Sequence, residues 1–168
     1  AVLHHSKKNF SKAREIYETL LKSYPKNSTI LQNYATLLSQ IKEYKKADDV
    51  FKNCLKIKPK DPLLLYNYAK FFHDQKIFKK AIKLYKESFE HNPENHLALY
   101  NIGNIYSLEE RFQEAIVMFK RSLEINPGNY MAYNNIGIAY KKIGNFEEAL
   151  KFYKKAIEKN SDYVDAHL

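Results

Sequence analysis

The stretch HLALYNIGNIYSLEERFQEAIVMFKRSLEINPGN, residues 96–129, decides the fold, because residues 130–163 repeat its pattern. The second stretch reads YMAYNNIGIAYKKIGNFEEALKFYKKAIEKNSDY. Positions equivalent to Pro127 recur at a constant interval along the chain and are occupied by Pro25, Pro59, Pro93 and, in the last copy, Ser161. One structural unit is therefore repeated along the chain. Such a chain is expected to work through its shape and surface rather than through a catalytic cluster.

Each unit carries the pattern of two amphipathic helices. Within each half the apolar residues recur at i, i+3, i+4 and i+7, as on one face of an α-helix. Twelve residues before each proline-marked position stands an alanine: Ala13, Ala47, Ala81, Ala115 and Ala149. Aromatic residues flank it, three residues before (Phe10, Tyr44, Phe78, Phe112, Phe146) and four residues after (Tyr17, Phe51, Tyr85, Phe119, Tyr153). Two helices joined by a tight turn are predicted for every copy.

Polar residues and prolines mark the ends of these helices. The prolines should end the second helix, because proline disfavours the helical conformation of the residue before it. Just after each bend comes a side chain that can accept a bond from a free amide at a helix start: Asn27, Asp61, Asn95 and Asn129. Pro62 stands at a first helical position, where its missing N–H costs nothing. Because Ser161 lacks this stop, the last helix is expected to fray or run on.

The pattern resembles the tetratricopeptide repeat, whose 34-residue motif is matched at Leu99, Ile102, Gly103, Tyr106, Ala115, Phe119 and Pro127. The resemblance implies an all-α fold, a superhelix of antiparallel helix pairs. It divides the chain into part of a repeat at 1–27, full repeats at 28–61, 62–95, 96–129 and 130–163, and the start of a further repeat at 164–168. Ala1 falls inside a first helix, and Val164 begins one that is not completed. Repeat arrays need end units with a polar outer face, so we expect a fragment of a longer protein.

Composition narrows the classes of function. The net charge is +9, but the lysines lie mostly on second helices, interleaved with acids, as in Lys45, Lys46, Lys79, Lys80, Lys154 and Lys155. This pattern is typical of a solvated outer face. The aromatic residues stand at core positions, so nucleic-acid binding is not expected. No apolar run approaches the ~20 residues needed to cross a bilayer. The single Cys54, in a slot of small packing residues, suggests a reducing compartment, and an intracellular, cytoplasmic location is predicted.

Signatures of an enzyme are missing from this stretch of sequence. There is no glycine-rich phosphate loop, since Gly103 and Gly137 stand at predicted helix crossings and Gly144 at a turn. No metal-ligand spacing links the histidines His4, His5, His73, His91, His96 and His167 to acids or cysteines. We therefore predict no catalytic residue, no cofactor and no metal site in this fragment.

The functional signal lies on the first helix of each full repeat. At ~100° per residue, positions 4, 7, 8 and 11 of a repeat face the core, whereas positions 6 and 9 face nearly the opposite way. Position 6 is asparagine in all four full copies: Asn33, Asn67, Asn101 and Asn135. The resemblance implies that this face lines a concave groove. A carboxamide offers a donor and an acceptor together, so a ladder of them could hold the backbone of an extended peptide.

This arrangement is similar to the asparagine ladder of the O-linked N-acetylglucosamine transferase repeat region and of importin-type solenoids. Two alternatives remain open, namely that these amides are solvated or that they bond between neighbouring helices. Selectivity would come from positions 5 and 9, where the candidates include Tyr66, Tyr100, Lys70 and Asn104. For each tyrosine, packing against the next repeat is an equal alternative.

One partner can be tested by position. The family's carboxylate clamp for chaperone tails needs lysine, asparagine and arginine at positions 5, 6, 9 and 13 of successive repeats. Neither the window from Ser28 nor that from Pro62 completes this set, so a chaperone's C-terminal tail is not an expected partner. We predict a scaffold that binds an extended peptide or partner segment in its groove and assembles a multiprotein complex. The alternative is the substrate-recruiting region of a larger enzyme, such as a glycosyltransferase of the O-linked N-acetylglucosamine type.

Overall fold

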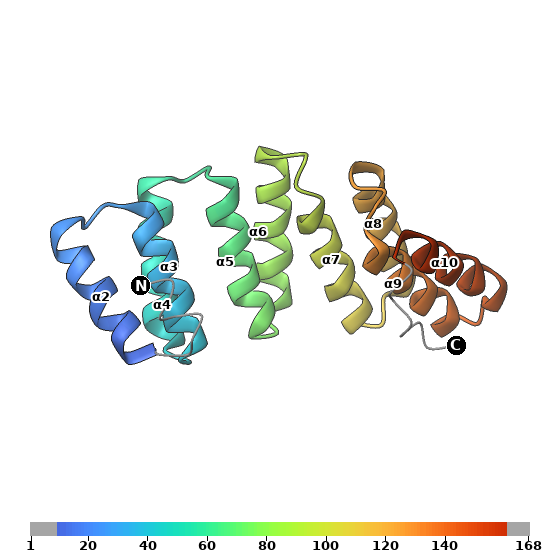
Figure 1. The fold of residues 1–168 in the computed structure, drawn as a ribbon, viewed down its shortest axis with the longest axis horizontal. Helices are drawn as coiled ribbons and strands as arrows, with labels where there is room; N and C mark the ends of the chain where they lie inside the picture. Colours follow the sequence, from blue (N-terminus) through green and yellow to red (C-terminus); the bar gives the residue numbers. More distant parts are fainter. Residues whose placement is uncertain (1–9, 161–168) are drawn as a thin grey trace. The chain divides into compact units, whose positions relative to one another are not determined.

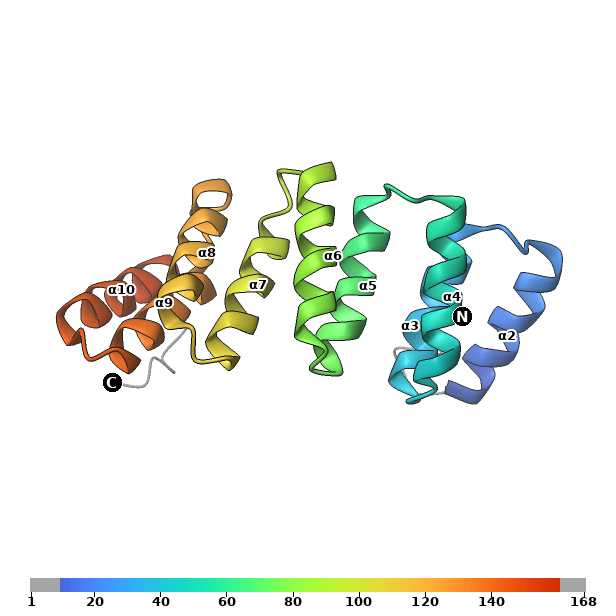
Figure 2. The same ribbon diagram turned by 180° about the vertical axis from the view of Figure 1, so that it is seen from behind.

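The computed structural model describes residues 10–160, which form nine α-helices and contain no strand. Figures 1 and 2 show them from opposite sides. In chain order they are α2 (Phe10–Ser23), α3 (Ser28–Gln40), α4 (Tyr44–Ile57), α5 (Pro62–Asp74), α6 (Phe78–His91), α7 (His96–Leu108), α8 (Phe112–Ile125), α9 (Tyr130–Lys142) and α10 (Phe146–Lys159). The predicted all-α class of paired helices is confirmed.

The chain divides into two compact units, residues 1–84 and 85–168. In the first unit α3 packs on α2, α4 and α5. In the second unit α8 packs on α7 and α9, and α9 packs on α10. Consecutive helices are therefore the main packing partners within each unit, as expected for helices joined by turns of a few residues.

Three of the four predicted N-caps form. Asn27 accepts a hydrogen bond from the Ile30 amide at 3.1 Å, and Asp61 accepts one from the Leu64 amide at 2.9 Å. Pro62 follows Asp61 at the start of α5, as predicted. Asn129 caps α9 in the same way through the Ala132 amide at 3.3 Å.

The prediction for Asn95 is wrong, because its side chain makes no capping bond at α7. Its Nδ2 instead donates to Ser88 Oγ at 3.5 Å. A hydroxyl on the preceding helix thus competes with the free amides for this side chain. Conversely, Asn145 caps α10 by accepting from the Glu148 amide at 3.2 Å, a role that the sequence analysis missed.

The prolines act as predicted at the ends of the second helices, because each of α2, α4, α6 and α8 ends two residues before its proline. Helix α10 has no such proline but ends at Lys159, the equivalent position, so the expected run-on is wrong. Asn160 takes an extended conformation with φ −149°, and its amide bonds back to the carbonyls of Ala156 and Ile157. Ser161, the repeat start at 164–168 and the N-terminal Ala1 lie outside the described residues.

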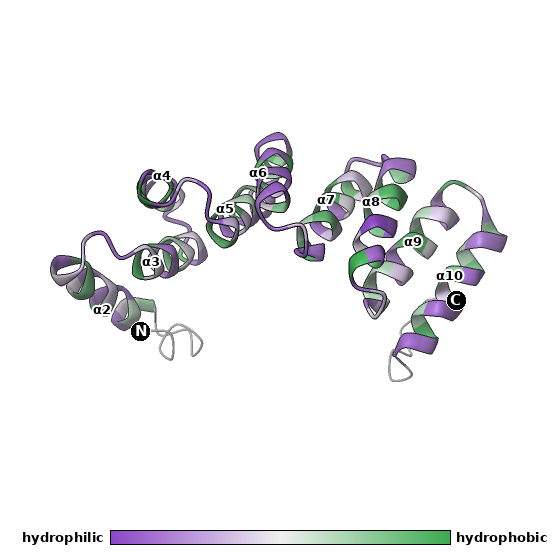
Figure 3. Cartoon of the chain, turned by 90° about the horizontal axis from the view of Figure 1, so that it is seen from above, coloured by the Kyte–Doolittle hydropathy of each residue, from purple (hydrophilic) through white to green (hydrophobic). Residues whose placement is uncertain are grey.

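The core follows the predicted alanine and aromatic positions. All five repeated alanines are buried, and so are the aromatic residues four places after them. Figure 3 shows green and purple residues on every helix, in keeping with their amphipathic pattern. The other aromatic position does not behave uniformly: Tyr44 is 40% exposed and Phe146 is 68% exposed. The expectation that all these aromatics lie in the core is therefore wrong for these two.

Hydroxyl–carboxylate bonds join neighbouring helices in the first unit. The Tyr34 hydroxyl on α3 donates to Glu18 of α2 at 2.8 Å, and Tyr68 on α5 donates to Asp48 of α4 at 2.5 Å. Burial, and then the bond to Glu18, raise the pKa of Tyr34 to about 12. The second unit has buried Ile136 at the equivalent place. The same position is thus polar and paired in one unit and apolar in the other.

In each full copy, one residue in the turn between the two helices has a left-handed backbone conformation. Lys42, Lys76 and Glu110 have φ of 64°, 59° and 59°, and Gly144 has 82°. These four residues occupy the same position in successive copies. Glycine adopts this conformation without strain, whereas other residues carry a steric cost. The turn between the paired helices therefore keeps three non-glycine residues in a backbone conformation that is disfavoured for them.

Gly144→Ala should lower the free energy of unfolding by about 1 kcal/mol, because a Cβ is strained at φ +82° although nothing lies within 4 Å to clash with it. Urea denaturation followed by circular dichroism measures the change. Lys142→Ala, two residues away on the exposed end of α9, is the matched control and should change stability by less than about 0.5 kcal/mol. Equal stabilities for the two variants would contradict the strain argument.

The outer surface is charged as predicted, since the six named lysines are all exposed. Cys54 is fully buried, its Sγ lies 3.7 Å from the Ser28 carbonyl, and burial raises its pKa to about 11. It is therefore a packing residue, as expected. Across residues 10–160, the helices are too short or too polar to span a bilayer.

Candidate peptide-binding site

The candidate site lies on the first helices of the pairs, α3, α5, α7 and α9, which we call the A helices. All four position-6 asparagines are half-buried on them. Half-burial leaves part of each carboxamide accessible. Each amide can offer a ligand only the donors and acceptors that are not already used in hydrogen bonds within the protein.

In the first unit, Asn67 bonds to the neighbouring A helix. Its Nδ2 on α5 donates to Gln32 Oε1 on α3 at 3.2 Å, and Gln32 is only 8% exposed. Asn67 makes no other hydrogen bond with a described residue, so its Oδ1 is left as an acceptor. The Thr36 hydroxyl does not occupy the Oδ1 of Asn67, because it donates instead to the backbone carbonyl of Gln32 at 3.0 Å.

A pocket opens beside Asn67, with a volume of about 380 Å³, its open mouth included. Its walls come from α3, α4 and α5: Thr36, Ser39, Gln40, Phe51, Asn67, Lys70, Phe71 and Asp74. The rings of Phe51 and Phe71 lie 5.4 Å apart and are almost completely buried, so they form an apolar floor. The pocket thus combines polar walls with a small aromatic base.

Charge at the pocket is balanced. Lys70 Nζ lies 3.2 Å from Asp74 Oδ2, one helical turn away, and both side chains are more than half exposed. Such a surface pair contributes little stability, but it neutralises the lysine locally. These two side chains therefore add no net charge to the pocket wall.

In the second unit, Asn135 is held more tightly. Its Nδ2 on α9 donates to the Tyr100 hydroxyl at 3.1 Å and to Asn104 Oδ1 at 3.0 Å, both on α7. The Tyr100 ring packs on Phe119, with ring centroids 5.5 Å apart. Tyr100 and Asn104 therefore help to join α7 and α9, and the Asn135 Oδ1 is the part of this amide that accepts no bond from the described residues.

The remaining predicted residues are placed less specifically. Asn101 and Tyr66 are half-buried on their A helices. Asn33 is also half-buried and makes no hydrogen bond with a described residue. In residues 10–160 no three His, Cys, Asp or Glu side chains come together in a way that could hold a metal ion.

Family models match most of the chain. The model for the PRP39 N-terminal HAT repeat matches residues 2–101, and the tetratricopeptide repeat model matches residues 98–160. The constant spacing of the proline-marked positions runs through both matched ranges. This chain belongs to the tetratricopeptide repeat family. The family's role as a protein-interaction scaffold therefore applies to it.

Solved tetratricopeptide repeat structures share the fold. A crystal structure of MamA is 25% identical, covers 95% of this chain and 93% of its own, and has a TM-score of 0.82. YrrB, described as a TPR protein with an unusual peptide-binding site, is 24% identical, with coverages of 98% and 84% and a TM-score of 0.75. PilF of Pseudomonas aeruginosa is 19% identical, with coverages of 95% and 72% and a TM-score of 0.83. No curated protein matches the chain.

For Asn67 and Asn135 of this tetratricopeptide repeat protein, the alternative that position-6 amides bond between neighbouring helices is what the structure shows, although their individual partners were not predicted. In both units Nδ2 of such an asparagine donates to a position-5 side chain of the preceding copy, Asn67 to Gln32 and Asn135 to Tyr100. The signal available was an oxygen-bearing side chain at position 5 of each preceding copy. The aromatic floor was missed as well, because Phe51 stands at a repeated core position and Phe71, at position 10, belongs to neither of the two faces considered.

Proposed function

We propose that this chain is a protein-interaction module whose A helices bind an extended peptide segment of a partner protein. The observation that carries the proposal is the pocket of the first unit. It is formed by the predicted site residues Asn67 and Lys70, together with Thr36 at position 9 of the preceding copy, above an aromatic floor. Peptide binding by YrrB is a precedent for this use of the fold. A partner segment held in this way would tether its protein in a complex.

The chemistry offered to the peptide is that of an acceptor. Because Nδ2 of Asn67 is used by Gln32, the peptide would donate a backbone N–H to Oδ1 of Asn67. The adjacent residue of the peptide would place a small or medium apolar side chain over Phe51 and Phe71. This replaces the expectation that each carboxamide would use its donor and its acceptor together.

The second unit also offers a position-6 carboxamide oxygen, but an aliphatic side chain lies beside it instead of an aromatic floor. Oδ1 of Asn135 is available there, beside Ile138 at position 9, which is 42% exposed. An apolar contact and one acceptor suit the backbone and an aliphatic side chain of an extended segment. Both units would thus bind uncharged stretches of peptide.

Magnitudes limit the affinity of each contact. One hydrogen bond contributes about 0.5–1.5 kcal/mol net, whereas association costs about 4–15 kcal/mol. Two acceptors cannot offset that cost alone. Burial of apolar peptide side chains must supply most of the affinity, at about 25 cal/mol per Å². The proposed ligand is therefore a peptide with an apolar anchor and not any exposed backbone.

Peptides selected from a random dodecamer display library against the whole chain provide the probe. Asn67→Ala should weaken the selected peptides by roughly three- to tenfold, because one hydrogen bond to the ligand is lost. Asn67→Asp keeps the acceptor and can still pair with a reoriented Gln32 amide, so binding should stay within about twofold of the original. Ser39→Phe should abolish binding by filling the pocket. Fluorescence anisotropy gives the dissociation constants.

Asn53→Ala is the matched control, since Asn53 lies exposed on α4 away from the pocket residues. It should leave the affinity unchanged, and circular dichroism should show all variants folded. If the selected peptides bind Ser39→Phe as well as the original chain, the proposed pocket is not where peptides bind.

A further inference from the structure

Gln32 contacts the candidate site without lining it. This residue stands on α3 at position 5, one copy before Asn67, and is only 8% exposed. It is not among the residues that line the pocket. Its Oε1 nevertheless accepts the hydrogen bond from Nδ2 of Asn67 at 3.2 Å. Gln32 can therefore act on a ligand in the pocket through Asn67, without touching the ligand.

The direction of this hydrogen bond decides which atom of Asn67 is offered to a ligand. Two carboxamides can bond in either direction, because each has a donor and an acceptor. If Gln32 donated to Oδ1 of Asn67, the pocket would present Nδ2, which is a donor. In the structure Gln32 accepts, so Nδ2 is turned toward α3 and Oδ1 is left for the ligand. One buried side chain thus sets the polarity of the pocket.

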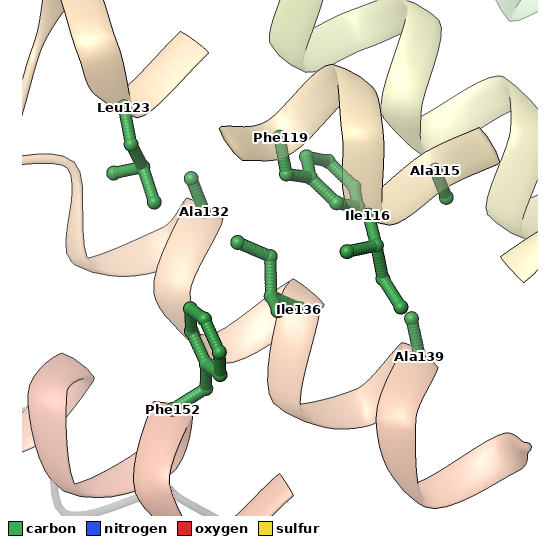
Figure 4. Packing of buried hydrophobic residues seen from close by; sticks show 8 residues of the cluster. All are labelled: Ala115, Ile116, Phe119, Leu123, Ala132, Ile136, Ala139 and Phe152. Carbon is green, nitrogen blue, oxygen red and sulfur yellow. The ribbon is translucent and has the colours of Figure 1, made fainter. Parts of the chain in front are cut away.

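The second unit contains the same arrangement with different side chains. Nδ2 of Asn135 donates to the hydroxyl of Tyr100, again at position 5 of the preceding copy, and to Oδ1 of Asn104. Both N–H groups of that amide are used. Figure 4 shows Ile136, the next residue of α9, among the buried side chains that pack α9 on α8. The backbone at Asn135 is thus held by apolar packing, and the position-5 oxygen helps to orient the amide.

We propose that Gln32 is a specificity-determining positioning residue, which makes the pocket select a backbone N–H and reject a peptide residue that lacks one. This inference rests on the peptide-binding function proposed above. The peptide residue at Asn67 could not be proline, whose nitrogen carries no hydrogen. A peptide acceptor at this place would face Oδ1, and neither oxygen would then have a donor. The ligand class is thus narrowed to segments that donate a backbone N–H beside the apolar anchor.

A backbone ester scan of the tightest dodecamer from the display selection tests this role. Each ester replaces one N–H by an oxygen with little change in shape. At one place the ester should weaken binding to the original chain by roughly tenfold, because its oxygen faces Oδ1 of Asn67. Gln32→Met keeps a side chain of similar size but frees Asn67 to turn Nδ2 to the ester oxygen. The ester-to-amide ratio of dissociation constants, from fluorescence anisotropy, should then fall to about threefold or less.

Gln32→Glu is the conservative variant, because a carboxylate can only accept and keeps Nδ2 of Asn67 turned toward α3. It should retain the roughly tenfold ratio. Gln113→Met makes the same change as Gln32→Met at an exposed glutamine on α8 and should leave the ratio unchanged. If Gln32 only stabilised the fold, Gln32→Met would weaken the amide and ester peptides equally. The ratio therefore separates positioning from a structural role.

Two results would overturn the inference while the proposed function stands. In both, Ser39→Phe abolishes binding, but either no ester in the scan weakens the peptide or the ratio is the same for Gln32→Met and the original chain. Binding that survives Ser39→Phe would overturn both proposals, because the peptides would then bind elsewhere. Circular dichroism checks the fold of each variant, and Gln32→Leu gives the same measurement if Gln32→Met does not fold.

Discussion

Phe119→Ala should lower the free energy of unfolding by about 3–5 kcal/mol, because it removes a large, completely buried side chain from the core of the second unit. The Phe119 side chain is completely buried, packs on the Tyr100 ring at 5.5 Å and lies against Gly103. Its removal would leave a cavity that helices on both sides can only partly close. Urea denaturation followed by circular dichroism measures the loss.

Phe146→Ala is the internal control for this experiment, since it removes the same group from a position that is 68% exposed. Surface substitutions of this kind usually change stability by less than about 0.5 kcal/mol. A loss of under about 1 kcal/mol for Phe119→Ala, or equal losses for the two variants, would show that Phe119 is not central to this core.

Gly137→Ala should lower the free energy of unfolding by about 1–3 kcal/mol, although alanine has the better helix propensity by about 1 kcal/mol. A Cβ at this position would lie 2.6 Å from Cε1 of Tyr153, closer than carbon atoms pack. The crossing of α9 and α10 would have to open to admit it. Thermal and urea denaturation of the single variant give the net effect.

The Tyr153→Leu variant tests whether the loss of stability in Gly137→Ala comes from the contact between the new Cβ and the Tyr153 ring. If the clash dominates, Gly137→Ala should cost less in the Tyr153→Leu background than in the original chain, a non-additivity expected for residues in contact. Gly128→Ala is the matched control, because its Cβ would approach nothing closer than 3.4 Å, the Asn126 Oδ1. Additive losses in the double variant would contradict the packing argument.

The repeat spacing was sufficient to predict the helices and most of the core. Helix ends were predictable where one local interaction dominates, as at Asn27 and Pro62. They were not predictable at Asn95, because Ser88 on another helix offers its side chain a competing partner. The left-handed conformation in the turn could be predicted from the residue type only at Gly144, because a lysine such as Lys42 does not indicate it.

The candidate site was predictable as a face but not as a set of contacts. Helical periodicity placed Asn67 and Thr36 on one side of their helices, and both line the pocket. Which atoms of Asn67 remain available depends on Gln32 in the preceding copy, and sequence patterns do not rank such distant partners. The binding roles assigned to Asn67 and the other site residues stay predictions.

The hydrogen bond from Asn67 to Gln32 would couple peptide binding at the pocket to the rigidity of helices α3 and α5. An amide whose oxygen accepts a hydrogen bond is polarised, and its N–H becomes a stronger donor. A guest N–H placed on Oδ1 of Asn67 would therefore tighten the bond from Nδ2 to Gln32 at the same moment. Helices α3 and α5 would then fluctuate less when loaded than when empty, and amide exchange in both would slow together.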